Sequence, residues 1–168
     1  MDPTYPWNYI GLGTNLGDRV GNITTALDHL KQRLELSTIE LSYLYATEPR
    51  MDLEQPTFIN AVARFAMEID PFELLRYTMA IEEQMGRQRD PNRPKGPRII
   101  DLDLLSVGSQ RVQTAELTLP HPGIPMRRFV LCPWADLDPE WRHPQTGQTI
   151  RQMLALTPDR GEVELWTP

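Results

Sequence analysis

The sequence predicts an α+β domain with a ferredoxin-like βαββαβ core, to which further strands and helices are added to give an α/β/α layered sandwich. The length of 168 residues fits one domain, so we expect residues 1–168 to fold as a single unit. Apolar residues alternate in some segments and recur at helical spacing in others. These segments follow the order strand, helix, strand, strand, helix, strand, which is typical of that core.

Each of the six segments has its own local signal. Short apolar or alternating runs bounded by polar turns indicate strands, and apolar residues three and four apart indicate helices. The segments are a strand at 9–12, a helix at 22–36, strands at 39–45 and 58–67, a helix at 71–86 and a strand at 98–105. The added strands and helices are expected at 111–119, 129–131 and 150–156.

Helix boundaries are predicted from capping residues. Asn22 is a candidate N-cap for the first helix. Asp70 is a cap residue for the second, with Pro71 in its first turn and Glu73 three residues after the cap. Gly86 is a natural C-terminal stop. Two loops, at 46–57 and 87–97, lie outside these segments.

Composition excludes several classes of protein. Hydrophobic residues make up 40% and charged residues 24% of the chain, which argues against a disordered, collagen-like or coiled-coil protein. A net charge of −6 disfavours a broad nucleic-acid surface. The single cysteine, Cys132, excludes an internal disulfide framework and a cysteine-cluster metal site. With neither a membrane-spanning run nor signal-peptide features, we expect a cytoplasmic protein that binds no membrane.

The sharpest local signal is the pair Asp101 and Asp103. Residues i and i+2 of a strand point to the same face, so the two carboxylates would stand side by side while Leu102 faces the core. Two close carboxylates repel each other unless a cation or a proton lies between them, and oxygen ligands suit magnesium. For this short motif alone, a merely solvated strand face is an equally good interpretation.

A basic segment precedes the two aspartates. Residues 87–98 contain five basic residues against one acidic residue, a local charge of +4 in a chain of −6. Arginine grips phosphate oxygens in a fork, so this segment beside the acidic pair is what a magnesium-nucleotide site would need. Taken alone, the segment is better interpreted as a solvated loop. Its position next to Asp101 and Asp103 reverses that preference.

Further residues have weaker signals. Phe58 and Asn60 share a strand face and would suit a flat heterocycle by stacking and amide hydrogen bonds, although core packing is the simpler interpretation. His121, between two prolines, is either a phosphate donor or purely structural. Arg127 and Phe129 offer another pairing of a cation with a ring. The glycine-containing start of the chain matches neither a dinucleotide-binding fingerprint nor a phosphate-binding loop.

With these motifs in order, the sequence resembles the 6-hydroxymethyl-7,8-dihydropterin pyrophosphokinases of folate biosynthesis. The most specific motif is G-P-R-x-x-D-L-D at residues 96–103, and the F-I-N-A motif at 58–61 adds to it. The resemblance covers about residues 9–131 and becomes loose after about 134. Its segments are Tyr9 to Leu16, Tyr45 to Pro49, Gln55 to Val62, Ile81 to Arg89, Gly96 to Leu104 and Leu119 to His121.

The resemblance implies a role for particular residues. It implies pterin contacts at Gly13, Thr47, Pro49, Phe58, Asn60 and Phe129. It implies ATP contacts at Glu82, Arg89, Arg98, Thr118, His121 and Arg127. It implies catalytic roles for Arg87, Arg98, Asp101 and Asp103, with two Mg²⁺ ions held by the two aspartates. Loops after Gly13, around Pro49 and around Arg93 would close over the site and exclude water.

The implied reaction is the transfer of pyrophosphate from ATP to the hydroxymethyl oxygen of the dihydropterin, with release of AMP. Positioning and charge stabilisation would carry the transfer, with Asp101 a candidate proton acceptor. A catalytically inactive pterin- or nucleotide-binding module on the same fold is the alternative. An RNA-binding domain is disfavoured by the acidic charge and by the lack of an aromatic RNA-binding strand. We expect a monomer whose partners are its two small-molecule substrates.

Overall fold

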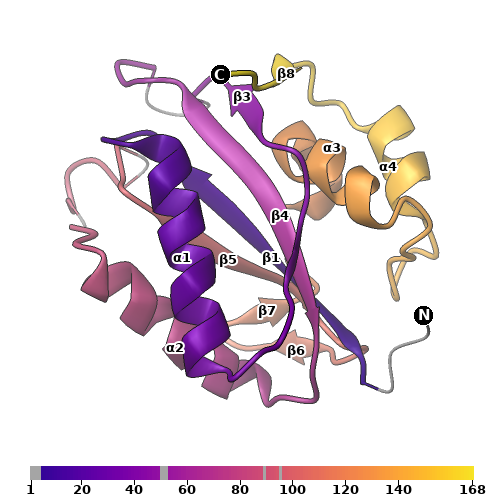
Figure 1. Cartoon of the computed structure of the whole chain (residues 1–168). Coiled ribbons are helices and arrows are strands. Elements are labelled where there is room, and N and C mark those ends of the chain that lie inside the picture. Colours follow the sequence, from indigo (N-terminus) through magenta and orange to yellow (C-terminus); the bar gives the residue numbers. More distant parts are fainter. Residues whose placement is uncertain (1–4, 50–52, 89, 95) are drawn as a thin grey trace.

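The computed structural model describes residues 5–49, 53–88, 90–94 and 96–168. Over these residues the chain is a mixed α/β protein in which an antiparallel sheet is covered by four α-helices (Figure 1). The elements are β1 (Trp7–Thr14), α1 (Arg19–Arg33), β2 (Glu40–Leu41), β3 (Tyr45–Thr47), β4 (Phe58–Ala66), α2 (Pro71–Gln84), β5 (Asp101–Val107), β6 (Val112–Gln113), β7 (Thr118–Leu119), the 3₁₀ helix η1 (Ile124–Met126), α3 (Arg128–Leu137), α4 (Ile150–Leu156) and β8 (Val163–Leu165).

The main sheet has the strand order β5-β1-β4-β3-β8, and β2 also pairs with β4. Each of these pairs is antiparallel, with β1 between β4 and β5. In this register Gly13 lies between Asn60 and Asp101. Strands that are distant in sequence therefore bring an amide and a carboxylate to either side of one glycine.

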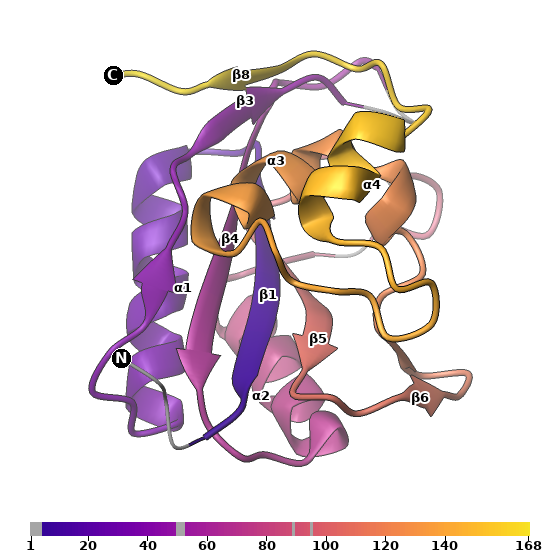
Figure 2. The same cartoon turned by 90° about the vertical axis from the view of Figure 1, so that its right-hand side faces the viewer.

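The sheet separates two hydrophobic clusters. Figures 1 and 2 show α1 and α2 on one face of the sheet and α3 and α4 on the other. Side chains alternate between the faces, as strand geometry requires. On β1, Ile10 and Leu12 belong to the cluster beneath α1 and α2, whereas Tyr9 packs with Trp134 and Ile150 in the cluster beneath α3 and α4.

The prediction for α2 is confirmed, and that for α1 is wrong at both ends. Asp70 caps α2 by accepting hydrogen bonds from the N–H groups of the first turn. For α1 the N-cap is Asp18, whose carboxylate accepts from Gly21 N. Asn22 lies inside that helix and donates instead to the carbonyl oxygen of Leu16. The helix ends at Arg33, before the predicted end at residue 36.

Each predicted core strand has different bounds in the structure. The strand at 9–12 runs from Trp7 to Thr14 and that at 58–67 ends at Ala66, while the other two differ more. The segment 39–45 divides into β2 and β3, because the Ser42 hydroxyl accepts from Val62 N and takes the place of a ladder contact. The segment 98–105 becomes a strand from Asp101 to Val107. Its start is delayed because both main-chain polar groups of Arg98 bond to Asn15 rather than to a neighbouring strand.

The later segments add elements to this core. Residues 111–119 form the β6-β7 hairpin, 129–131 lie in α3, and 150–156 form α4. A strand that was not predicted, β8, pairs with β3 at the sheet edge. Among the described residues, no helix is long and apolar enough to cross a membrane.

Candidate active site

A cavity of about 680 Å³ lies on the face of the sheet that α3 covers, where β1 ends and β4 and β5 begin. Its walls come from the sheet, the end of α2, the segment before β5, and the start of α3. Eleven of the residues implied by the resemblance line it: Gly13, Thr47, Phe58, Asn60, Glu82, Arg87, Arg98, Asp101, Asp103, Arg127 and Phe129. The fold thus gathers residues from six separate stretches of sequence into one site.

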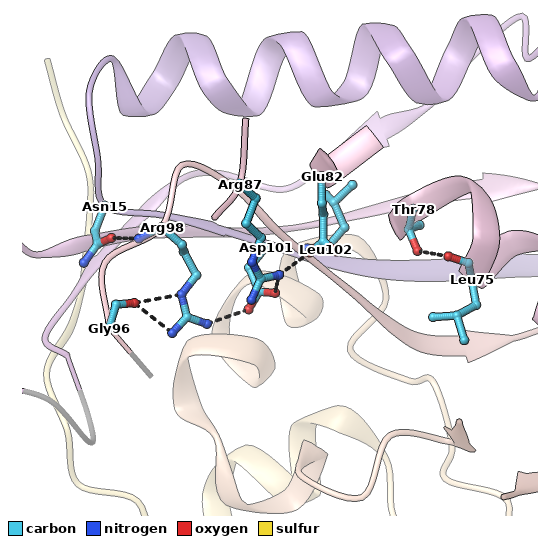
Figure 3. A network of polar contacts seen from close by, with 9 residues as sticks. All are labelled: Asn15, Leu75, Thr78, Glu82, Arg87, Gly96, Arg98, Asp101 and Leu102. Carbon is cyan, nitrogen blue, oxygen red and sulfur yellow. Dashed lines mark hydrogen bonds and ion pairs between the residues drawn. The ribbon is translucent and has the colours of Figure 1, made fainter. Parts of the chain in front are cut away.

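Asp101 is held by two arginines. Its Oδ1 accepts from Arg87 at 2.7 Å, and its Oδ2 accepts from Arg98 at 3.1 Å (Figure 3). Arg98 also donates from Nε and a terminal nitrogen to the Gly96 carbonyl oxygen, at 3.1 and 3.0 Å. These bonds fix the Arg98 guanidinium at the cavity wall.

Glu82 joins α2 to the acidic strand. This residue is 4% exposed, and its Oε2 accepts from Arg87 at 2.5 Å and from the backbone N–H of Leu102 at 3.0 Å. Leu102 lies between Asp101 and Asp103, so Glu82 holds the backbone that carries both aspartates. Figure 3 shows Glu82, Arg87 and Asp101 gathered at one place beside Leu102.

The two aspartates have different acidities. Burial raises the pKa of Asp101, but Arg87 and Arg98 outweigh burial, so the net pKa is below its ordinary value. Burial, and then the charge of Asp101, raise the pKa of Asp103 to about 7. Glu82 also has a raised pKa because of its burial. A cation placed between Asp101 and Asp103 would relieve the repulsion that raises the pKa of Asp103.

Two aromatic rings and an amide also line the cavity. The Arg98 guanidinium carbon lies 5.5 Å from the centre of the Phe58 ring, and that of Arg127 lies 5.7 Å from the Phe129 ring. Asn60 is buried and donates from Nδ2 to the Thr47 hydroxyl at 2.6 Å. A Cβ at Gly13 would come within 2.7 Å of Asn60 Oδ1, so only glycine leaves that oxygen its position.

Some predicted site residues lie elsewhere. Pro49, Thr118 and His121 are not among the described residues that line the cavity. His121 donates its backbone N–H to the Leu105 carbonyl oxygen, and its Nδ1 accepts from Gly123 N. Arg89 lies outside the described residues, as does Lys95 in the same loop. The roles implied for these residues stay predictions.

Sequence reasoning missed other parts of the site. Leu75, Met79 and Met126 form an apolar part of the cavity wall, and Met79 and Met126 are half exposed. Leu75 and Met79 have the same helical spacing on α2 as core residues, so their pattern does not mark them as site residues. Gln55 also lines the cavity and bonds to the buried Asn15. Both residues stand in motifs of the resemblance, but their type and spacing give no signal for a site.

Comparisons with known proteins agree on one family. The family model for 7,8-dihydro-6-hydroxymethylpterin-pyrophosphokinase (HPPK) matches residues 9–139. The 2-amino-4-hydroxy-6-hydroxymethyldihydropteridine pyrophosphokinase of Pseudomonas aeruginosa is 38% identical over 153 residues, covering 91% of this chain and 93% of that protein. A folic acid synthesis protein of Schizosaccharomyces pombe is 37% identical over 91% of this chain, which spans 21% of that longer protein.

A solved structure has a similar fold. A crystal structure of HPPK-DHPS in complex with substrates aligns with a TM-score of 0.70 over 92% of this chain and 43% of that chain, at 15% sequence identity. At that identity the likeness concerns the fold alone. The family model spans all the described residues that line the cavity, and the bacterial relative matches 91% of the chain. The chain therefore belongs to the 7,8-dihydro-6-hydroxymethylpterin-pyrophosphokinase family.

Proposed function

We propose that the cavity is the active site for the reaction of this family, in which pyrophosphate is transferred from ATP to the hydroxymethyl group of 6-hydroxymethyl-7,8-dihydropterin in folate biosynthesis. One observation carries the proposal. A single cavity is lined by an amide and two aromatic rings together with three arginines and two aspartates. A flat heterocycle and a polyphosphate require these two kinds of surface.

The pterin would lie between Phe58 and Phe129. Both rings line the cavity, and each has an arginine above it. The bond from Asn60 to Thr47 fixes the amide so that its Oδ1 stays close to Gly13 and is available as an acceptor. These contacts support a subsite that recognises both the face and the edge of a heterocycle.

Asp101 and Asp103 fit a magnesium site that the substrate completes. Mg²⁺ commonly takes one or two carboxylates together with substrate phosphates. Among the described residues there is no group of three or more His, Cys, Asp or Glu side chains able to hold a metal, which agrees with a site completed by ATP. We propose that two Mg²⁺ ions bind here. Bound Mg²⁺ would neutralise charge on the ATP phosphates.

The arginines would orient the phosphates for transfer. The pterin hydroxyl oxygen forms a bond to the β-phosphorus, and the bond from that phosphorus to the oxygen bridging to the α-phosphate breaks, with the electron pair leaving on AMP. The hydroxyl proton passes to solvent. Asp101 is a weak proton acceptor in this conformation, because both its oxygens accept hydrogen bonds from arginines and its pKa is lowered. We therefore assign the transfer to positioning and charge stabilisation.

We also propose that the core is of the ferredoxin-like type with an α/β/α layering. The strand order β5-β1-β4-β3 supports this, because each helical crossover joins strands that flank a third, antiparallel strand. Helices on both faces support the layering. Its consequence for the site is that the ends of β1, β4 and β5 meet at the cavity.

The test is production of AMP from ATP and 6-hydroxymethyl-7,8-dihydropterin in the presence of Mg²⁺. Pterin-dependent AMP supports the proposal, and its absence from a folded protein would favour the inactive binding module. Asp103→Ala should abolish turnover with the fold intact. Asp28→Ala, at an exposed position on α1, is the matched control and should leave turnover unchanged. Wild-type rates in Asp103→Ala would refute the metal assignment.

A further inference from the structure

Asn15 is a buried residue that bonds to two segments of the cavity wall. It follows β1 directly, is 2% exposed, and does not itself line the cavity. Its Oδ1 accepts from the backbone N–H of Arg98 at 2.8 Å. Its Nδ2 donates to Gln55 Oε1 at 2.9 Å and to the Pro56 carbonyl oxygen at 3.0 Å. All the hydrogen-bonding groups of the amide are therefore used, and its orientation is fixed.

The contact with Arg98 is two-sided. Besides the side-chain bond, the backbone N–H of Asn15 donates to the Arg98 carbonyl oxygen at 3.1 Å. Both main-chain polar groups of Arg98 thus bond to one residue, just before β5 begins. Figure 3 shows the bond between the Asn15 side chain and Arg98. The side chain of Arg98 extends from this anchored backbone to Asp101.

The other contacts of Asn15 fix the start of β4. Pro56 stands two residues before Phe58, and Gln55 lines the cavity. The Arg98 guanidinium lies over the Phe58 ring at 5.5 Å, so the two segments that Asn15 joins meet again at the site. A buried donor or acceptor that loses its hydrogen-bond partner costs the folded protein free energy, so these contacts hold the two segments in place.

We propose that Asn15 is a positioning residue that sets the distance between the phosphate-binding Arg98 and the pterin-binding segment Gln55–Phe58. The inference rests on the proposed function. Transfer requires the pterin hydroxyl and the ATP phosphates to lie in reacting geometry, and small misplacements are costly to the rate. Asn15 therefore acts on kcat through two other segments, without touching either substrate.

Asn15→Asp separates the two contacts. The variant keeps an oxygen for Arg98 N, but replaces the donor to Pro56 by a second oxygen, which repels a carbonyl group that cannot donate. We expect kcat to fall by at least about tenfold, with the KM for ATP changed by less than about threefold, because Arg98 stays anchored. Asn15→Ala removes both contacts and should lower kcat further.

Asn8→Asp is the matched control. Asn8 lies at the other end of β1, is fully buried, and makes the same set of bonds: Nδ2 donates to the Phe65 and Met67 carbonyl oxygens, and Oδ1 accepts from Gly108 N. It is remote from the cavity lining. Asn8→Asp and Asn15→Asp should lose similar stability, but only the latter should lose kcat. Equal Tm losses with kcat within about twofold of wild type in both variants would overturn the proposal.

Gln55→Ala provides a second measurement if Asn15→Asp fails to fold. It removes one partner of Asn15 from a partly exposed loop. Gln55 accepts from Asn15, which in turn accepts from the Arg98 amide, so we expect faster hydrogen exchange at that amide, transmitted through Asn15. Unchanged exchange at that amide, together with unchanged kcat, would overturn the proposal. Because exchange needs no turnover, this measurement stands even if the wild-type protein produces no pterin-dependent AMP.

Discussion

Replacing Glu82 should reveal whether its hydrogen bond or its charge stabilises the protein. Glu82 is buried and accepts from Leu102 N at 3.0 Å and from Arg87 at 2.5 Å. Its raised pKa, caused mainly by burial, means that burying the charge costs more than Arg87 returns. The hydrogen bond to Leu102 should then account for the stabilisation.

Two variants separate these effects. Glu82→Leu leaves the buried N–H of Leu102 without an acceptor, which costs about 1–3 kcal/mol, while Arg87 keeps its bond to Asp101. For a chain of this size that loss lowers Tm by about 2–12 °C. Glu82→Gln keeps an oxygen that accepts from Leu102 N and no longer buries a charge. We therefore expect its free energy of unfolding to stay within about 1 kcal/mol of wild type.

The assay is urea unfolding at pH 7 followed by circular dichroism, with Glu83→Gln as control. Glu83 is the next residue on α2 and is exposed, so this variant should stay within about 0.5 kcal/mol of wild type. If Glu82→Gln lowers the free energy of unfolding as much as Glu82→Leu does, the ion pair dominates and the reasoning is refuted.

Three more predictions concern other regions. Gly13→Ala places a Cβ within 2.7 Å of Asn60 Oδ1 and should raise the KM for the pterin by about tenfold or more, measured by initial rates. Burial lowers the pKa of His143, so the contribution of its neutral form to the free energy of unfolding should be complete above about pH 6.5 and should be lost as the pH falls below it. Urea melts at several pH values should show a smaller decrease on acidification in His143→Gln. Chelation of Mg²⁺ by EDTA should stop AMP production and added Mg²⁺ should restore it, whereas persistent activity in EDTA would contradict the magnesium site.

Local signals predicted those elements whose causes lie within a few residues. The cap at Asp70 and the alternation around Asp101 and Asp103 depend on neighbours in the sequence, and both match the structure. The start of β5 could not be predicted this way, because it depends on a bond between Arg98 and Asn15, which lie far apart in the chain. The N-cap of α1 was misassigned because Asp18 and Asn22 are both suitable cap residues.

The candidate site was predictable in its residue types more than in its arrangement. The acidic pair and the basic segment are adjacent in sequence, so their proximity follows from the strand pattern. The neighbours Gly13, Asn60 and Asp101 meet only through the register of three strands. Apolar wall residues such as Met79 have the same helical spacing as core residues, which is why the pattern did not mark them.

The pairing of β8 with β3 has a consequence for folding during synthesis. Tyr45 pairs with Leu165, so one edge of β3 stays without its neighbour until almost all of the described chain has left the ribosome. An unpaired strand edge is a template for association with other chains. Thr47, on the same strand, bonds to Asn60 at the cavity. The nascent chain therefore exposes an unpaired strand edge next to the future cavity until β8 is added.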